Sequence, residues 1–351
     1  MFSEIPVLDL RKWNASESSD QRRQFASELL EISHRVGFLL LTGHGVEPTF
    51  LDRYFSALDE FFALPDAVKA RIDKFESPHF RGWERVGAEL TDNRVDYREQ
   101  LDLCTAHDPY AYDIVPPFLR LDGPNQWLDE ATIPGFRATV EEFLSMMGAI
   151  ADQLMSALSS AFGLAEDHLK NVFGERPMSL AKLIRYPQTP AGQCGVNAHH
   201  DAGFITVLVQ HRVGGLQALN PEGEWIDVPV VPGTLVINLG EMLQEISGNY
   251  VVATTHRVIA TQPRFSSAYF HGPDLRTRLD PLPLAPSFAE AVRNSPRHAN
   301  AGFMAKRDEL LAGKSGQAST GTGVYGQQLW NYYARSYPAN MARHHADAMD
   351  R

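Results

Sequence analysis

Apolar side chains recur at three- and four-residue steps in several stretches of the chain, which is the spacing of one buried helix face. These stretches are 19–35, 47–63, 135–163 and 325–341, the last interrupted near Pro338. The longest carries one apolar stripe from Val140 to Phe162 and is followed by Gly163, a residue suited to end a helix. We therefore predict a helix in each stretch, with 135–163 packed along the outside of a larger core.

The pattern changes near residue 180, where short runs rich in β-branched and aromatic residues alternate with Gly, Pro and Asn turns. Many short strands with regular turns are typical of a sandwich or a barrel, and we expect a double-sheet jelly roll of the cupin kind. The runs are 179–186, 195–199, 204–210, 215–219, 224–228, 234–238, 249–252, 255–261 and 265–271. The predicted fold class is α+β, a double-stranded β-helix core flanked by N-terminal helices and a long outer helix.

We expect residues 1–351 to form a single domain with three parts. Residues 1–115 combine helices and strands, 116–290 hold the long helix and the jelly-roll core, and 291–351 form a loop followed by a C-terminal helix. The stretch 295–323 is weakly hydrophobic and ends in KSGQASTGTG, which predicts a flexible loop or a lid.

Composition narrows the class of partner. The net charge of −11 argues against a general nucleic-acid binder, which usually presents a basic face, but it does not exclude a small anionic ligand. No apolar run approaches the length that spans a bilayer, and the N-terminus lacks the basic and apolar segments of a secretory signal. With only two cysteines, a disulfide framework is excluded and a cytoplasmic location fits. The sequence makes no prediction about oligomeric state.

One group of residues predicts a metal site. His199 and Asp201 are two positions apart in a β-rich run, so on a strand they share a face while His200 points the other way. His256 lies in a second β-rich run, and two neighbouring strands could bring the three side chains together. Two histidines and one carboxylate on one face of a metal are the ligand set of non-haem Fe(II) enzymes that bind O₂. A chain with thirteen histidines can show such a triplet by chance, so the triplet alone does not decide.

A second pair lies eight residues beyond His256. Arg264 and Ser266 also share a strand face, in a run that is otherwise largely apolar. A guanidinium can donate two parallel hydrogen bonds to a carboxylate, and a buried arginine is costly without an anionic partner. The pair therefore predicts either a site for an anionic ligand or a structural salt bridge to one of the chain's own acids.

Together these residues resemble the isopenicillin N synthase-like family of 2-oxoglutarate- and Fe(II)-dependent dioxygenases, which carries an H-x-D, a distal histidine and an R-x-S in this order. Further segments match that family in order over nearly the whole chain. They are IPVLDL (5–10), GFLLLTGHGV (37–46), FFALP (61–65), RYP (185–187), GGLQ (214–217) and PGTLVINLGEML (232–243). The sequence departs from the family pattern at His200, where the family often has Thr or Ser, and at Glu241, where it usually has Asp.

The resemblance implies an enzyme whose iron is held by His199, Asp201 and His256. It implies that Arg264 and Ser266, with Tyr186, hold the far carboxylate of 2-oxoglutarate. O₂ is then the second cosubstrate, and hydroxylation of a small organic molecule, with release of succinate and CO₂, is the expected reaction. Two alternatives remain at this stage: an Fe(II)/O₂ oxidase of the same family that does not use 2-oxoglutarate, and a jelly-roll binding protein without turnover.

Other polar and aromatic residues are candidates for secondary roles. We expect each histidine ligand to be oriented by a hydrogen-bond acceptor, for which Asn197 and Asn238 are polar candidates. Residues expected to line the substrate pocket are Arg81, Trp83, Arg98, Phe204, Tyr269 and His271.

Overall fold

The computed structural model describes every residue except 1, 15–18, 92–93, 296–322 and 349–351. Its strands form an eight-stranded major sheet in the order β1-β2-β12-β9-β14-β7-β6-β3 and a four-stranded minor sheet in the order β11-β10-β13-β8, beside the small β4–β5 hairpin. The major-sheet strands are β1 (Val7–Asp9), β2 (Phe38–Thr42), β3 (Gly82–Glu84), β6 (Glu99–Cys104), β7 (Leu180–Tyr186), β9 (Ile205–Gln210), β12 (Leu235–Leu239) and β14 (Arg264–His271). The others are β4 (Leu90–Thr91), β5 (Arg94–Val95), β8 (Val196–His199), β10 (Leu216–Leu219), β11 (Trp225–Asp227) and β13 (His256–Val258).

The two larger sheets share an apolar cluster, because each strand points alternate side chains toward the other sheet. Phe38 and Val236 from the major sheet belong to the same buried cluster as Leu216 and Val258 from the minor sheet. Apart from the parallel β1–β2 pair, the strands of both sheets pair antiparallel. This is the jelly-roll core predicted from the sequence, within an α+β fold.

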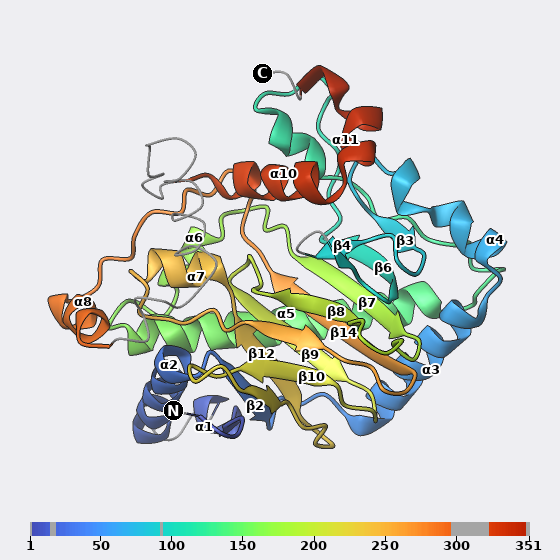
Figure 1. Cartoon of the computed structure of the whole chain (residues 1–351). Coiled ribbons are helices and arrows are strands. Elements are labelled where there is room, and N and C mark those ends of the chain that lie inside the picture. Colours follow the sequence, from blue (N-terminus) through green and yellow to red (C-terminus); the bar gives the residue numbers. More distant parts are fainter. Residues whose placement is uncertain (1, 15–18, 92–93, 296–322, 349–351) are drawn as a thin grey trace.

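Helices cover the outer face of the major sheet (Figure 1). The long helix α5 contacts strands β9 and β14 as well as helices α2 and α3, as its apolar stripe predicted. It ends just before Gly163, whose φ of +77° takes the left-handed conformation that glycine adopts without strain. The helices are α1 (Arg11–Asn14), α2 (Ser19–Arg35), α3 (Pro48–Ala63), α4 (Asp66–Lys69), α5 (Phe136–Ala161), α6 (His168–Val172), α7 (Glu241–Ile246), α8 (Pro286–Arg293), α10 (Tyr325–Ser336) and α11 (Pro338–His344).

One predicted strand, 249–252, is wrong. Its apolar residues are buried, but the backbone leaves helix α7 through a turn at Gly248 and Asn249, both with positive φ. Neighbouring groups then take the backbone bonds that a strand would have made: the Val252 N–H donates to the Ser33 carbonyl, and the Ala253 N–H donates to the Gln244 side chain. Apolar composition alone could not separate a buried loop from a strand.

Two further expectations concerned a loop or lid near the C-terminus and the absence of a membrane-spanning segment. The predicted loop or lid at 295–323 lies almost entirely outside the described residues. Within the described ranges, none of the helices combines the length and the apolar character that crossing a bilayer requires.

Candidate active site

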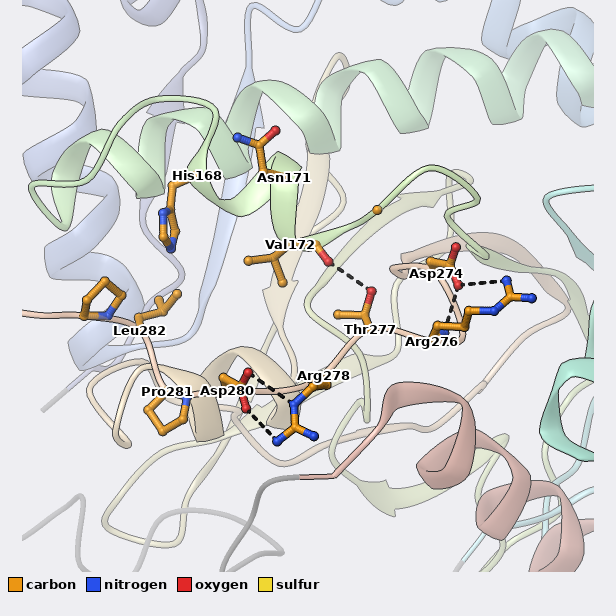
Figure 2. A pocket seen from close by; sticks show the side chains of 12 residues that line it. His168, Asn171, Val172, Asp274, Arg276, Thr277, Arg278, Asp280, Pro281 and Leu282 are labelled. Atoms are coloured by element: carbon orange, nitrogen blue, oxygen red, sulfur yellow. Dashed lines mark hydrogen bonds and ion pairs between the residues drawn. The ribbon is translucent and has the colours of Figure 1, made fainter. Parts of the chain in front are cut away.

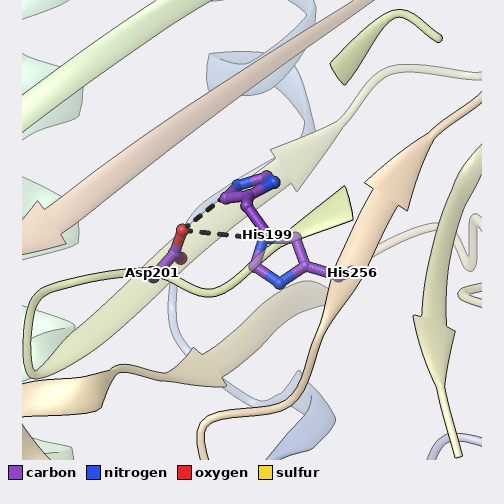
Figure 3. A group of neighbouring side chains, drawn as sticks. All are labelled: His199, Asp201 and His256. Atoms are coloured by element: carbon purple, nitrogen blue, oxygen red, sulfur yellow. Dashed lines mark ion pairs between the residues drawn. The ribbon is translucent and has the colours of Figure 1, made fainter. Parts of the chain in front are cut away.

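Three side chains from two strands and a turn converge at one end of the jelly roll. Nε2 of His199 lies 3.6 Å from Oδ1 of Asp201, and Nε2 of His256 lies 3.5 Å from the same oxygen. Figure 3 shows the two imidazoles and the carboxylate facing a common point, and one ligand atom from each lies within 4.8 Å of the others. Two histidine nitrogens and one carboxylate oxygen at this spacing fit a single Fe(II) ion.

Hydrogen bonds hold each of these side chains in a ligating orientation. Nδ1 of His199 bonds to the carbonyl of Asn197 at 2.8 Å, and Nδ1 of His256 bonds to the carbonyl of Thr254 at 3.1 Å. In both rings Nδ1–H is therefore the donor and Nε2 remains available to a metal. Asn197 thus orients a ligand as proposed from the sequence, but through its backbone carbonyl rather than its side chain.

The carboxylate is fixed by residues of the opposite sheet. Oδ2 of Asp201 accepts hydrogen bonds from Thr206 of β9, at 2.5 Å, and from Asn238 of β12, at 2.6 Å, which leaves Oδ1 directed at the two histidines. Asn238 was expected to orient a histidine and instead orients the aspartate. The role of Thr206 was not predicted from the sequence. The available signal was a polar side chain in an apolar strand shortly after the H-x-D.

The local geometry differs in part from a single strand carrying both His199 and Asp201. Strand β8 ends at His199, and Asp201 lies in the turn that follows. The histidines, by contrast, are direct cross-strand partners, because β13 pairs with β8 in a register that sets His256 opposite His199. His200 points away as expected, and its Nε2 lies 2.7 Å from the Thr255 hydroxyl.

The charges of the triad perturb one another. Burial would raise the pKa of Asp201, but the adjacent His256 and His199 hold it well below its usual value. Burial would lower the pKa of His256, but the Asp201 carboxylate raises it above the ordinary value of 6.5. Without a metal, the buried carboxylate therefore favours a proton on the same Nε2 that a metal would use.

This competition between a proton and a metal predicts that, as the pH rises, the stability of the metal-free protein falls while the affinity for the metal increases. The proton on His256 stabilises the metal-free fold below about pH 6.5, and this contribution disappears as the pH rises through the higher pKa of the folded state. Metal affinity should increase over the same rise, because the proton no longer has to be displaced. Anaerobic Fe(II) titrations and melting curves at several pH values test both trends. An affinity independent of pH between about 6 and 8 contradicts the prediction.

Arg264 lies on the inner face of the major sheet, directly opposite Tyr186 in the register of β14 and β7. Its side chain is almost fully buried, yet among its nitrogens only one Nη has a hydrogen-bond partner, the Gln210 side chain at 3.1 Å. Nε and the other Nη have none among the described residues. None of the described carboxylates forms the structural salt bridge that was the alternative from the sequence, and the incompletely paired guanidinium fits an anionic ligand.

Ser266 follows two residues later on the same face and is fully buried, as is Tyr186. The guanidinium carbon of Arg264 lies 4.9 Å from the centre of the Tyr186 ring. Arg264, Ser266 and Tyr186 thus lie close together on the inner face of the major sheet, as the family resemblance implied, and we call these three residues the wall around Arg264. Gln210 was not predicted as part of this group. The available signal was that Gln210 is the polar residue that ends the apolar run 205–210.

Three of the expected substrate residues face the other way. Tyr269 and His271 are offset by an odd number of residues from Arg264, so they lie on the outer face of β14. His271 Nε2 is 3.1 Å from Asp152 of α5, and the Phe204 ring packs edge-on against Phe173, 5.0 Å between centroids. Tyr269 and His271 therefore do not line the pocket, because alternation along β14 and contact with α5 direct them outward. Phe204 precedes β9, and its packing against Phe173 in the outer apolar cluster directs it away from the triad.

The remaining expected substrate residues have partners within the protein. Arg81 is fully buried and donates to the backbone carbonyls of His79 and Leu121. Trp83 donates through Nε1 to Glu99, on the outer face of β6, at 3.1 Å. These contacts give both residues structural roles. Arg98 differs, because it precedes β6 on the inner side and belongs to a buried group of charges described below.

A separate surface pocket of about 480 Å³ lies between helix α6 and the segment that follows β14. Figure 2 shows two ion pairs among its lining residues, Arg278 with Asp280 and Arg276 with Asp274, whose N–O distances are 3.4 and 3.9 Å. It shares no residue with the triad or with the wall around Arg264, so it is not part of this site.

Comparison with known proteins agrees with the geometry. Residues 5–130 match the family described as non-haem dioxygenase in morphine synthesis, N-terminal, and residues 175–273 match the 2OG-Fe(II) oxygenase superfamily. The second match contains the three metal-ligand candidates together with Arg264 and Ser266. The chain belongs to the isopenicillin N synthase-like superfamily of 2-oxoglutarate- and Fe(II)-dependent oxygenases.

Among its relatives is a 2-oxoglutarate-dependent dioxygenase, frbJ, of Dothideomycetidae sp. strain 11243, with 34% identity over 77% of this chain and 74% of the relative. Homoarginine-6-hydroxylase 2-ODD-C23 of Glycine max is 29% identical over 80% of this chain and 89% of its own length. A Neurospora crassa protein crystallised in complex with alpha-KG and thymine superposes with a TM-score of 0.69, at 25% identity over 81% of this chain and 91% of that chain. The protein is an oxidoreductase, a 2-oxoglutarate-dependent dioxygenase that uses Fe(II) and fits small-molecule substrates.

Proposed function

We propose that His199, Asp201 and His256 hold the Fe(II) ion, and that Arg264, Ser266 and Tyr186 hold the far carboxylate of 2-oxoglutarate, for the hydroxylation of a small organic molecule. The observation that carries this assignment is the Arg264 guanidinium. It is buried on the inner face of the sheet with two nitrogens unpartnered among the described residues, in the same interior that receives the triad. A dianionic 2-oxo acid supplies the missing charge at one end and a chelating group at the other.

The side chains of the chain have positioning tasks in this reaction. Arg264 and Ser266 donate hydrogen bonds to the far carboxylate and so fix how far the cosubstrate extends into the jelly roll. The carbonyls of Asn197 and Thr254 keep both imidazole rings turned toward the metal. Iron, with 2-oxoglutarate and O₂, supplies the oxidising chemistry when bound. In the overall balance, R–H, 2-oxoglutarate and O₂ become R–OH, succinate and CO₂.

The two alternatives from the sequence have less support. A binding protein without turnover does not require three metal ligands that are each fixed by oriented hydrogen-bond partners. An oxidase that uses only Fe(II) and O₂ has less support because the family model that covers the site and the more similar relatives are named for 2-oxoglutarate.

Oxygen consumption with and without 2-oxoglutarate, combined with succinate detection, tests the proposal. We expect slow 2-oxoglutarate-dependent oxygen uptake with succinate formed in equal amount, even before the substrate is known. Oxygen uptake that is independent of 2-oxoglutarate would favour the oxidase. Absence of 2-oxoglutarate binding to protein loaded anaerobically with Fe(II) would favour the binding protein.

We also propose the cytoplasm as its location. Support comes from the two cysteines: Cys104 is buried, Cys194 is partly buried, and both are free thiols. Free thiols are typical of a reducing compartment. Expression with a tag on either terminus, followed by fractionation of the native host, tests this assignment.

A further inference from the structure

A buried chain of alternating charges lies beside the jelly-roll interior. We call it the ion-pair chain, and it runs in the order Glu84, Lys74, Asp102, Lys182, Glu89, Arg98 and Asp96. The successive N–O distances are 3.3, 2.7, 2.9, 3.2, 2.6 and 3.2 Å, and each side chain is at most 10% exposed. So many charges removed from water are expensive, and pairing alone commonly does no better than apolar packing. Their retention inside this protein points to a function.

The ion-pair chain lies on the same face of the major sheet as the proposed 2-oxoglutarate wall. Asp102 of β6 is the cross-strand partner of Lys182 of β7, and Lys182 shares a face of β7 with Tyr186. The two residues are four positions apart, which at about 3.4 Å per residue places them roughly 14 Å apart along the strand. The cosubstrate is held at the Tyr186 end, so the Lys182 end is available to a second molecule.

The other end of the ion-pair chain reaches the metal ligands. Oδ1 of Asp96 accepts hydrogen bonds from the backbone N–H and the side-chain amide of Asn197, at 3.0 and 2.9 Å. The carbonyl of the same asparagine orients His199. The ion-pair chain is therefore joined to the metal-ligand candidates through Asn197.

Two buried acceptors in this group have no donor among the described residues. Oδ2 of Asp102 receives both Lys74 and Lys182, but its Oδ1 has no partner. Gln100, which shares the Asp102 face of β6, donates from its amide to Glu84 and Glu89, while its Oε1 has no partner. Leaving a buried polar atom unsatisfied costs about 1–3 kcal/mol. The missing complement to both oxygens is a group that donates hydrogen bonds.

The charge balance favours a donor that is also a cation. The ion-pair chain begins and ends with a carboxylate, so four carboxylates face three cationic side chains. Burial raises the pKa of Glu84, Lys74 lowers it, and the nearby carboxylates of Glu89 and Asp102 raise it, so that it lies above its usual value. An added positive charge would relieve this excess. Nε of Arg98 also has no partner among the described residues and suits an acceptor oxygen on the same ligand.

Helix α10 closes over this group. The Tyr332 hydroxyl donates to Glu89 at 3.1 Å, and the Tyr337 hydroxyl just beyond the helix donates to Glu84 at 3.5 Å. Figure 1 shows α10 and α11 lying at the same end of the molecule as β3, β4 and β6. Both hydroxyls donate to glutamates, so Oδ1 of Asp102 and Oε1 of Gln100 remain as acceptors for a ligand.

We propose that this group is the substrate-recognition site, and that the substrate is a small molecule with a protonated amine or a guanidine that donates to Asp102 and Gln100 and an acceptor oxygen near Arg98. The assignment deepens the proposed oxygenase function and rests on it. It predicts discrimination by charge, because a neutral compound of equal shape leaves the buried excess of negative charge in place.

Matched pairs of small carboxylic acids without an α-amine test this assignment. 4-Guanidinobutanoate and 4-ureidobutanoate have nearly the same shape but differ in charge, as do 5-aminopentanoate and hexanoate. With the full-length protein loaded anaerobically with Fe(II) and 2-oxoglutarate, we expect at least one basic probe to bind about 10- to 100-fold more tightly than its neutral partner by calorimetry. The same probe should stimulate succinate release. Equal binding within both pairs overturns the proposal.

Variants separate recognition from stability. Asp102→Asn should remove the preference for the basic probe, whereas Glu99→Gln changes a buried carboxylate on the opposite face of the same strand and should preserve it. If Asp102→Asn does not fold, Gln100→Met retains every charge and should still weaken the basic probe about 10-fold. A variant that melts earlier but keeps the ratio of 4-guanidinobutanoate to 4-ureidobutanoate affinity shows a purely structural role and contradicts the assignment. If the unsubstituted protein does not bind 2-oxoglutarate, the proposed function itself is contradicted instead.

Discussion

Replacing His256 with alanine should abolish Fe(II) binding and, with it, succinate formation from 2-oxoglutarate. The three ligand atoms lie within 4.8 Å of one another, so removal of one leaves two groups that cannot define a face of the metal. Loss of an outer hydrogen-bond partner of a metal ligand commonly costs about 10- to 100-fold in affinity, and loss of a ligand should cost more. Anaerobic Fe(II) titration and a succinate assay measure both effects.

His200 provides a matched control for this substitution. It is adjacent to a ligand and is also a histidine, but its ring is directed at the Thr255 hydroxyl, away from the triad. His200→Ala should therefore retain iron affinity within a few-fold. If His200→Ala loses iron and His256→Ala keeps it, the ligand assignment is wrong.

Substituting Arg264 with leucine should weaken 2-oxoglutarate binding by about 100-fold or more. Each charge-assisted hydrogen bond to a carboxylate contributes about 1.5–3 kcal/mol, and the two unpartnered guanidinium nitrogens can donate two of them. Arg264→Lys should restore only part of the affinity, because an ammonium cannot reproduce the planar pair of donors. Titration of 2-oxoglutarate into iron-loaded protein and the KM for 2-oxoglutarate report the loss.

Stability provides the counterpart measurement. Without 2-oxoglutarate, Arg264→Leu should not lower the melting temperature, because it removes a buried charge whose pairing is incomplete. Arg257→Leu is the control: Arg257 also lies on a strand but stacks 4.0 Å over the Trp225 ring and donates to Gln217, so its loss should not affect 2-oxoglutarate affinity. A large loss of stability with unchanged 2-oxoglutarate affinity in Arg264→Leu would assign that arginine a structural role.

The sequence predicted the parts of this protein whose signal is local. Helix periodicity placed α2, α3 and α5 within about two residues, and alternation along strands put Arg264 and Ser266 on one face. The prediction failed at 249–252, where buried apolar residues form a loop whose backbone groups make hydrogen bonds to other segments. Short helices such as α6, α7 and α8 were also missed, since they are brief and their stability comes from packing rather than from periodicity.

The candidate site divides in the same way. The triplet and the R-x-S did not decide separately, but their order, together with the matching segments over nearly the whole chain, indicated iron and 2-oxoglutarate through the resemblance to the family. Tyr269 and His271 were misplaced, because their aromatic character said nothing about which side of β14 faces the outer helices. Lys182, Gln100 and Asp102 went unnoticed as a group, although polar residues at alternate positions of apolar strands were visible.

By itself, the sequence carried the residue types and their order, which through the family resemblance predicted the metal ligands and an arginine for an anionic cosubstrate, and it predicted a core of alternating strands. Only the tertiary structure decided the rest. Pairing of β13 with β8 set His256 opposite His199, and pairing of β6 with β7 joined the buried charges of 84–102 to Lys182. Such contacts join residues far apart in the chain, and their energies depend on burial and distance, which local composition does not encode.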